Sequence, residues 1–259
     1  MDHLRLEPRG AVLHVRLARP AKRNAINDAL VAELHAVFDG IARTDDGVRS
    51  VVLSGDGEAF CAGLDLSELG ERSTADGIGH SRSWHTAFDR IEKGRVPVVA
   101  VLHGAVVGGG LELASACHVR VAEPSAFFAL PEGSRGLFVG GGGSARIPKL
   151  IGVARMADMM LTGRVYRGAE AHAAGFAQYA VGEGEGLERG LALAEQIAKN
   201  APLSNFAVLH ALPRIAEMGQ DHGLFTEALM AAIAQGDDAA KQRMRAFLDK
   251  KAGKVGQAS

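Results

Sequence analysis

The residues with the clearest chemical potential are three consecutive glycines and a glutamate, Gly108-Gly109-Gly110-Leu111-Glu112. They follow an apolar stretch at 98–102 that is typical of a buried strand, and the residues after them are typical of a helix. Glycines at such a junction let a ligand approach the backbone and leave the first helical N–H groups free. These N–H groups can stabilise a developing negative charge. Glu112, in the first turn of the expected helix, is therefore placed to move a proton beside that charge.

A second candidate loop lies earlier in the chain, at Ala59-Phe60-Cys61-Ala62-Gly63-Leu64-Asp65-Leu66. It follows an expected strand at 50–54, and Asp65 is of a residue type that caps helix N-termini. Two strand-to-helix turns, each with glycine where a ligand would touch the backbone, would supply two N–H donors to one oxygen atom. The two loops therefore predict an active site that stabilises an oxyanion.

Together the two loops resemble the crotonase superfamily, the enoyl-CoA hydratases and isomerases. The resemblance rests on A-F-C-A-G-x-D-L and H-G-x-x-x-G-G-G-x-E-L, and it extends from the basic segment 19–25 to the C-terminal helices. It implies an α/β fold with a spiral of ββα units over residues 1–185. Residues 186–259 are then expected to form a helical region that builds homotrimers, or hexamers made of two trimers.

The resemblance also implies a reaction and the residues that carry it. The expected reaction is the reversible syn addition of water to a trans-2-enoyl-CoA, giving a 3-hydroxyacyl-CoA, as in the β-oxidation of fatty acids. Glu112 and Glu132 are the expected catalytic residues, because Glu132 follows a proline 20 residues after Glu112, as in the hydratases. One group activates water and the other delivers a proton to the α-carbon. The expected oxyanion donors are the backbone N–H groups of Leu64 and Gly109.

The expected substrate is an acyl-CoA thioester, so coenzyme A is part of the substrate. No further cofactor and no metal is expected. The residues expected to contact the substrate or its coenzyme A are Lys22, Arg23, Ala25, Ala62, Gly63, Asp65 and Gly108. A solvated basic turn is the alternative explanation of Lys22 and Arg23. Lys250 or Lys251 of a neighbouring subunit is a further candidate phosphate contact.

The acyl pocket of relatives corresponds to the segment 70–84 of this chain, and Trp84 or Phe88 could line the pocket. The segment does not reveal the length of the acyl chain. Two positions depart from the family pattern: His118 stands where an aspartate is common, and the segment 133–136 replaces an aliphatic-x-Leu-Gly sequence. Both departures are expected to act on the surroundings of Glu132 and hence on its pKa.

Related reactions remain as alternatives. Isomerases of the superfamily usually manage with only the later glutamate, and the aromatic hydratase–lyases usually lack the earlier one. Dehalogenases use an aspartate in the loop that is 139–143 here, which carries no acid. A Clp-type serine protease shares the spiral, but this chain has no G-x-S-x-G sequence and no serine at position 112. A non-catalytic acyl-CoA-binding relative remains the strongest rival.

The composition excludes other classes of protein. Lys+Arg 29 against Asp+Glu 30 leaves a net charge of −1, so no basic field for nucleic acid is expected. Two cysteines show no metal-ligand spacing. No apolar run is long enough to span a bilayer, and the N-terminus lacks a signal-peptide core, so a cytoplasmic protein without membrane contact is expected.

The hydrophobic pattern predicts the remaining elements. A β-hairpin is expected at the N-terminus and a helix from the Asn27 cap to about Ala42. His103 and His118 are expected to be packed or surface groups rather than catalysts. The other expected elements are strands at 4–7, 12–17, 118–122 and 126–129, and helices at 75–93, 186–199, 202–218, 221–234 and 237–248.

Overall fold

The chain divides into two compact units, Met1–Ala198 and Lys199–Ser259. The computed structural model describes residues 1–44, 46–68 and 70–249. Both sheets lie in the first unit, whereas the described part of the second unit is helical. The α/β class predicted from the sequence is confirmed.

A six-stranded sheet in the order β1-β2-β3-β4-β6-β9 forms the centre of the first unit. β1 and β2 form the predicted antiparallel hairpin. The other neighbouring pairs of this sheet, β2–β3, β3–β4, β4–β6 and β6–β9, are parallel. Parallel strands end at the same edge of a sheet, so the loops that follow β3 and β4 are brought to one edge. The strands are β1 Leu4–Arg9, β2 Val12–Leu17, β3 Ser50–Gly55, β4 Val98–Leu102, β6 Val119–Ala122 and β9 Tyr179–Ala180.

Both faces of this sheet are covered, which explains why β3 and β4 are apolar throughout instead of alternating. Successive side chains of a strand point to opposite faces. Val51 and Leu53 accordingly join the larger hydrophobic core, whereas Val52 between them joins a smaller cluster with Leu193. Side chains from the two faces of one strand thus pack into two separate cores.

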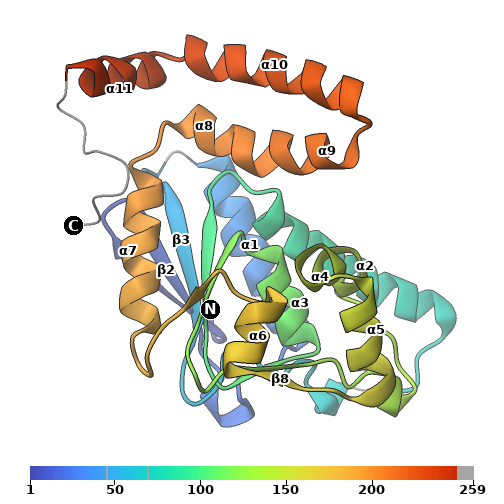
Figure 1. The fold of residues 1–259 in the computed structure, drawn as a ribbon. Coiled ribbons are helices and arrows are strands. Elements are labelled where there is room, and N and C mark those ends of the chain that lie inside the picture. The colour runs from blue at the N-terminus through green and yellow to red at the C-terminus, as the bar shows by residue number, and fades with distance from the viewer. Residues whose placement is uncertain (45, 69, 250–259) are drawn as a thin grey trace. The chain divides into compact units, whose positions relative to one another are not determined.

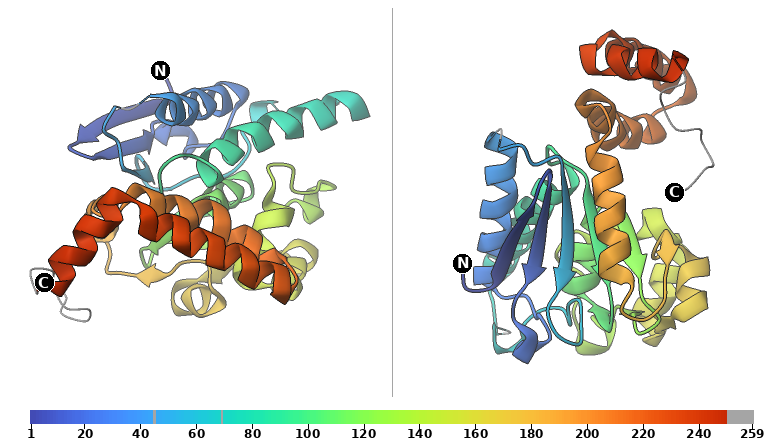
Figure 2. Two further views of the ribbon diagram at one scale, coloured as in Figure 1. Left: turned by 90° about the horizontal axis from the view of Figure 1, so that it is seen from above. Right: turned by 90° about the vertical axis from the view of Figure 1, so that its left-hand side faces the viewer.

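The helices α1 (Asp28–Arg43) and α7 (Gly186–Ala198) cover the opposite faces of the sheet (Figures 1 and 2). The Asn27 side chain accepts a hydrogen bond from the Leu30 N–H and caps α1, as predicted. Because α7 packs against the sheet, it belongs to the first unit. The two units therefore divide after Ala198, one helix later than the expected boundary at 185/186.

A second, three-stranded sheet consists of β5, β7 and β8. A strand of the main sheet is followed by a strand of this second sheet and then by a helix, first as β4-β5-α3 and then as β6-β7-α4. This repetition is the predicted spiral of ββα units. β7 lies within the predicted strand 126–129, whereas β5 and β8 were not predicted, since segments of two or three residues give little sign of a strand period. The strands are β5 Ala105–Val107, β7 Phe127–Ala129 and β8 Tyr166–Arg167.

The remaining helices of the first unit include three short 3-10 turns. The residue predicted as a helix cap, Asp65, accepts a hydrogen bond from the Ser67 N–H and caps only such a turn, whereas Ser73 caps α2. The helices are η1 Pro20–Lys22, η2 Leu66–Glu68, α2 Thr74–Glu92, α3 Gly109–Ala116, η3 Gly133–Arg135, α4 Gly143–Ile151, α5 Val153–Thr162 and α6 Gly168–Ala174.

The described part of the second unit contains α8, a π-helical turn η4, and α9 to α11. Within this unit α10 packs against α9 and η4. The predicted helices all occur, with ends shifted by a few residues. No described helix combines the length and apolar character that crossing a bilayer requires. The elements are α8 Pro202–Phe206, η4 Ala207–Ala211, α9 Leu212–Glu217, α10 Gln220–Gly236 and α11 Asp238–Leu248.

Candidate active site

The two glycine loops predicted from the sequence meet through β5. The Cys61 N–H donates to the Ala105 carbonyl at 2.9 Å, and the Val107 N–H donates to the Cys61 carbonyl at 3.1 Å. The start of α3 lies so close to this loop that a Cβ at Gly110 would be 2.3 Å from the Cys61 carbonyl oxygen. Only glycine fits at that contact, so residue 110 lets the two loops form one site.

The two predicted oxyanion donors are adjacent. A Cβ at Gly109 would lie 3.6 Å from the Leu64 nitrogen, and a Cβ at Gly63 would lie 3.5 Å from the Gly109 nitrogen. The residues before the donors, Gly63 and Gly108, have φ of +99° and +52°, a region that favours glycine. Neither donor N–H is hydrogen-bonded to another residue that the structure describes. Both are therefore available to one oxygen atom of a ligand.

Glu112 lies in the first turn of α3 and is only 3% exposed. Its Oε1 atom accepts hydrogen bonds from the N–H groups of Gly141 and Gly143, both at 2.8 Å. Burial raises the pKa of Glu112 to about 7, against the opposing effect of the two hydrogen bonds, and the charge of Glu132 raises it further. A carboxyl group with such a pKa can both accept and donate a proton near neutral pH.

Sequence reasoning missed the role of the loop that holds Glu112. The sequence of the loop 139–143 indicated only that it carries no acid, yet the N–H groups of Gly141 and Gly143 bind the Glu112 carboxyl. Buried Arg146 stabilises the loop by donating to the Gly141 carbonyl at 3.1 Å, and it pairs with Asp89 at 2.6 Å and with Glu92 at 2.7 Å. The available signal was a run of glycines before a helix, the same one that identified 108–110.

Glu132 follows β7 and lies at the start of the η3 turn. Its Oε2 atom is buried and has no hydrogen-bond partner among the described residues, and a Cβ at Gly108 would lie 2.6 Å from its Oε1 atom. Burial raises the pKa of Glu132, whereas its own backbone N–H and the charge of Arg135 oppose the rise. A buried carboxyl oxygen without a partner is unfavourable in a purely structural role, which supports a functional one.

Both glutamates and both donors line one pocket of about 180 Å3. The sequence predicted this convergence, and the structure brings together Glu112, Glu132, Leu64 and Gly109. The apolar part of the wall includes Trp84, Leu66, Val107, Leu137, Phe138 and Val139.

The loop at 19–26 lies beside the first glycine loop. The Ala62 N–H donates to the Arg23 carbonyl at 2.9 Å, and the Ile26 N–H donates to the Gly63 carbonyl at 2.7 Å. Lys22 and Arg23 are exposed, and neither side chain is paired with another described residue. The structure thus places two free cations next to Ala62, where an anionic part of a substrate could be bound.

Two other predicted contacts lie away from the pocket wall. The Asp65 carboxylate pairs with Arg19 at 2.8 Å, and hydrogen bonds from Ser67 and Arg19 lower its pKa to about 2. Arg19 also donates to the carbonyl of Ala25. These bonds stabilise the two loops, a role of Arg19 that sequence reasoning missed. A direct substrate contact at Asp65 or Ala25 stays a prediction, and Lys250 and Lys251 lie outside the described residues.

Of the two departures from the family pattern, only one acts on Glu132. Arg135 lowers the pKa of Glu132, as expected for a nearby cation. His118 instead accepts a hydrogen bond from the Val98 N–H at 2.9 Å, and its Nε2 lies 3.1 Å from the Glu92 carbonyl. His118 therefore ties β4 to the end of α2, and the expectation that it acts on Glu132 gains no support.

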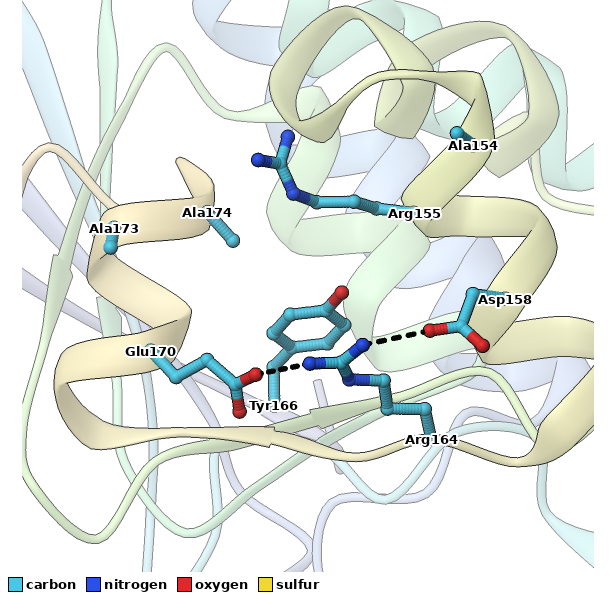
Figure 3. Close-up of a pocket in the computed structure, with 8 residues that line it drawn as sticks. All are labelled: Ala154, Arg155, Asp158, Arg164, Tyr166, Glu170, Ala173 and Ala174. Carbon is cyan, nitrogen blue, oxygen red and sulfur yellow. Dashed lines mark hydrogen bonds and ion pairs between the residues drawn. The ribbon is translucent and has the colours of Figure 1, made fainter.

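A larger pocket, of about 420 Å3, lies between α5 and α6 (Figure 3). Arg164 spans this pocket, bonds to both Asp158 and Glu170, and lies over the ring of Tyr166 at 4.6 Å. Both carboxylates are thus paired with one guanidinium, so neither is an unpaired acid or base in this pocket. The smaller pocket is therefore the candidate active site.

Several known proteins resemble this chain over most of its length. A sequence model described as enoyl-CoA hydratase/isomerase matches residues 7–257. The Escherichia coli (strain K12) 2,3-dehydroadipyl-CoA hydratase is 32% identical over 251 residues, which cover 97% of each chain. A peroxisomal Delta(3,5)-Delta(2,4)-dienoyl-CoA isomerase of Arabidopsis thaliana is 30% identical over 237 residues, covering 86% of this chain and 85% of the isomerase. A structure from Rhodopseudomonas palustris, provisionally assigned as an enoyl-CoA hydratase, is 57% identical with a TM-score of 0.92, covering 96% of this chain and 95% of that one.

Proposed function

The chain belongs to the enoyl-CoA hydratase/isomerase family, the crotonase superfamily, and from that premise we propose that it is an enoyl-CoA hydratase. It adds water reversibly to a trans-2-enoyl-CoA and forms a 3-hydroxyacyl-CoA. The observation that carries this proposal is the pair of buried carboxyl groups, Glu112 and Glu132, in one pocket with the N–H groups of Leu64 and Gly109.

In the proposed reaction the thioester carbonyl oxygen accepts hydrogen bonds from the N–H groups of Leu64 and Gly109. The double bond is conjugated with this carbonyl, so attack of water at the β-carbon moves negative charge onto the carbonyl oxygen. Removal of one such donor typically raises the barrier by about 2.7–4 kcal/mol. The two adjacent donors therefore support a reaction that passes through an enolate-like transition state.

The two carboxyl groups supply the proton transfers. The ionised member of the pair accepts a proton from water as its oxygen bonds to the β-carbon, and the protonated member gives its proton to the α-carbon. Burial raises the pKa of both Glu112 and Glu132, so the pair can retain one proton near neutral pH. Because both groups line the same pocket, we propose that the two parts of water add to the same face of the double bond.

An isomerase is the second candidate, since a dienoyl-CoA isomerase is among the relatives. Moving a double bond requires removal and return of a proton, which one carboxylate can perform. In this chain a second carboxyl, that of Glu112, is buried and hydrogen-bonded in the same pocket. An isomerase with one working acid would leave that group without a chemical role, so the pair favours hydration.

The test is to mix the purified protein with crotonyl-CoA without added cofactor. We expect loss of the enoyl-thioester absorbance and formation of 3-hydroxybutyryl-CoA, identified by a mass gain of one water. A panel of medium-chain and aromatic trans-2-enoyl-CoAs and of 3-enoyl-CoAs separates the alternatives. Turnover of the 3-enoyl-CoAs alone would indicate an isomerase, and cleavage of the hydrated aromatic product a hydratase–lyase. Binding of every thioester without turnover would indicate a non-catalytic acyl-CoA-binding protein.

The remaining parts of the proposal concern the coenzyme A moiety and assembly. Lys22 and Arg23 bind its phosphates, because both are exposed and unpaired beside Ala62. The backbone at Gly63 and Gly108 contacts the thioester end. No cofactor beyond the coenzyme A of the substrate takes part, and the active form is a homotrimer or a pair of trimers.

A further inference from the structure

We propose that Trp84 limits the length of the acyl chain and that the substrate is a short-chain enoyl-CoA. This inference rests on the proposed function, because it concerns the acyl group bound beside Glu112 and Glu132. Trp84 lines the pocket, is 4% exposed and is the one tryptophan in the sequence.

The six-membered ring of Trp84 lies between the two backbone segments that serve the reaction. A Cβ at Gly109 would lie 2.7 Å from Cζ3 of the indole, and a Cβ at Gly141 would lie 2.9 Å from Cε3. The first segment offers the N–H group of Gly109 to the thioester, and the second donates to the Glu112 carboxyl. If the carbonyl oxygen of an acyl group is bound at Gly109, the first carbon atoms of its chain therefore lie next to this ring.

The indole is held firmly from behind. Phe88 packs against it edge to face, with ring centroids 5.6 Å apart, and is itself fully buried. The His80 ring lies 5.7 Å from the indole and also lines the pocket. Protein interiors are close-packed, so a large aromatic group with such neighbours cannot be displaced without disturbing them. Trp84 thus acts as a fixed wall.

The volume of the pocket agrees with a short chain. It measures about 180 Å3, and an apolar cavity of roughly 150 Å3 holds one benzene molecule. By the same comparison the pocket holds roughly seven carbon-sized atoms, which the thioester group and the acyl chain have to share. A longer chain would have to pass the indole.

The test measures binding of saturated acyl-CoAs, which cannot be hydrated. Butyryl-CoA and decanoyl-CoA are titrated into the wild-type protein and into Trp84→Leu by calorimetry. We expect the wild type to bind butyryl-CoA at least about tenfold more tightly than decanoyl-CoA. Since each buried methylene raises affinity by roughly fourfold, room for two more should raise the decanoyl-CoA affinity of Trp84→Leu at least about tenfold. Trp84→Phe should lie between the two.

Phe176→Leu is the matched control, because Phe176 is a fully buried aromatic residue that stacks on Phe128 and does not line the pocket. It should keep the wild-type preference. An equal gain in decanoyl-CoA affinity in this variant would attribute the effect to general loosening and overturn the inference. Tight binding of decanoyl-CoA by the wild type would overturn it without any variant.

The binding data also separate this inference from the proposed function. If the Trp84 variants change the chain-length selectivity of binding but the protein hydrates no enoyl-CoA, the proposed hydration is refuted and the proposed role of Trp84 is supported. If the wild type hydrates crotonyl-CoA and folded Trp84→Leu has the same chain-length profile, the proposed hydration is supported and the proposed role of Trp84 is refuted. The quenching of the single tryptophan by butyryl-CoA, compared with free coenzyme A, gives a further direct readout: no change in its emission would contradict contact with the acyl group.

Discussion

The surroundings of Glu112 and Glu132 distinguish them from the other acidic residues. Glu112 accepts two backbone N–H groups, yet its burial still raises its pKa to about 7. Glu132 has one buried oxygen that accepts no hydrogen bond from a described residue. Because an ionised carboxyl is more costly to bury than a neutral one, both groups retain protons more strongly than exposed glutamates do. The charge of Glu132 adds to the raised pKa of Glu112, so the two groups in one pocket are not independent.

Replacing either acid by its amide tests its role in proton transfer. Glu112→Gln and Glu132→Gln should each lower kcat by at least about 10²–10⁴ while butyryl-CoA affinity changes little, because the amide keeps the shape of the side chain but not its proton chemistry. Steady-state kinetics with crotonyl-CoA and calorimetry measure the two effects. Glu188→Gln, which removes an exposed carboxylate from α7, is the control. Near-normal kcat in either active-site variant would remove that residue from the mechanism.

The raised pKa of Glu112 also predicts a pH-dependent stability. Below its ordinary pKa of 4.5 the group is neutral in both the folded and the unfolded chain, so its burial adds no cost of ionisation. As pH rises from there to about 7, the unfolded chain loses the proton first and the folded state loses stability. Above that range the loss amounts to about 3 kcal/mol.

Glu112→Gln removes this titration, and its amide oxygen can still accept from Gly141 and Gly143. The variant should therefore be more stable relative to wild type at pH 8 than at pH 5, which means a larger free energy of unfolding relative to wild type at pH 8. Urea unfolding at the two pH values measures the difference. The same relative stability at both would show that the carboxyl is not held in a protonated state by the fold.

At the scale of elements, two helix starts form the site. α3 (Gly109–Ala116) begins with the N–H group that is proposed to bind the thioester, and α4 (Gly143–Ile151) begins at the N–H groups that bind Glu112. The first N–H groups of a helix have no partner within the helix and carry its positive end. Each helix start therefore favours negative charge, one on the proposed substrate and one on the carboxyl of Glu112.

Gly109→Pro tests the first of these helix starts. Proline removes the N–H donor, but any Cβ at this position also meets the Trp84 ring at 2.7 Å. Gly109→Ala is therefore the matched control, since it adds the same Cβ and keeps the N–H group. Gly109→Pro should have a kcat about 10²–10³ below that of Gly109→Ala. Equal kcat in the two folded variants would mean that the carbonyl oxygen is bound elsewhere.

At the scale of the whole molecule, the second unit exposes many apolar side chains. Four of its described residues are buried, namely Ala201, Asn205, Leu209 and Gly223. Apolar residues that are roughly half or more exposed occur along its helices, including Leu224, Phe225, Leu229, Ile233, Met244, Phe247 and Leu248. Many exposed apolar side chains in one unit are typical of a protein–protein interface. They support the proposed assembly into trimers.

Phe225→Glu should weaken that assembly, because Phe225 is 67% exposed in the isolated chain and a charge would oppose its burial between subunits. Light scattering after gel filtration at micromolar protein should give a trimer or hexamer for wild type and smaller species for the variant. Gln235→Glu adds the same charge at an exposed polar position of α10 and should leave the mass unchanged. A monomeric wild type would refute the proposed assembly.

The sequence by itself determined the features that depend on neighbouring residues. The Asn27 cap, the apolar strands and the glycines before Glu112 are local signals, because capping, periodicity and positive φ involve only a few consecutive residues. The parallel pairing of the predicted strands, which the structure shows, explains why the two glycine loops meet. By contrast, the short strands β5, β8 and β9 were not predicted, because so few residues show no period. The helices α4 to α6 were not predicted either.

Only the tertiary structure decided which groups contact the residues of the candidate site. The N–H groups that bind Glu112 come from residues 141 and 143, the guanidinium on Asp65 comes from Arg19, and the ring against Gly109 is that of Trp84. These partners lie 25 to 46 residues away in the chain, so no local pattern links them. The pKa of each acid depends on burial and on such distant partners, and both exist only once the chain has folded.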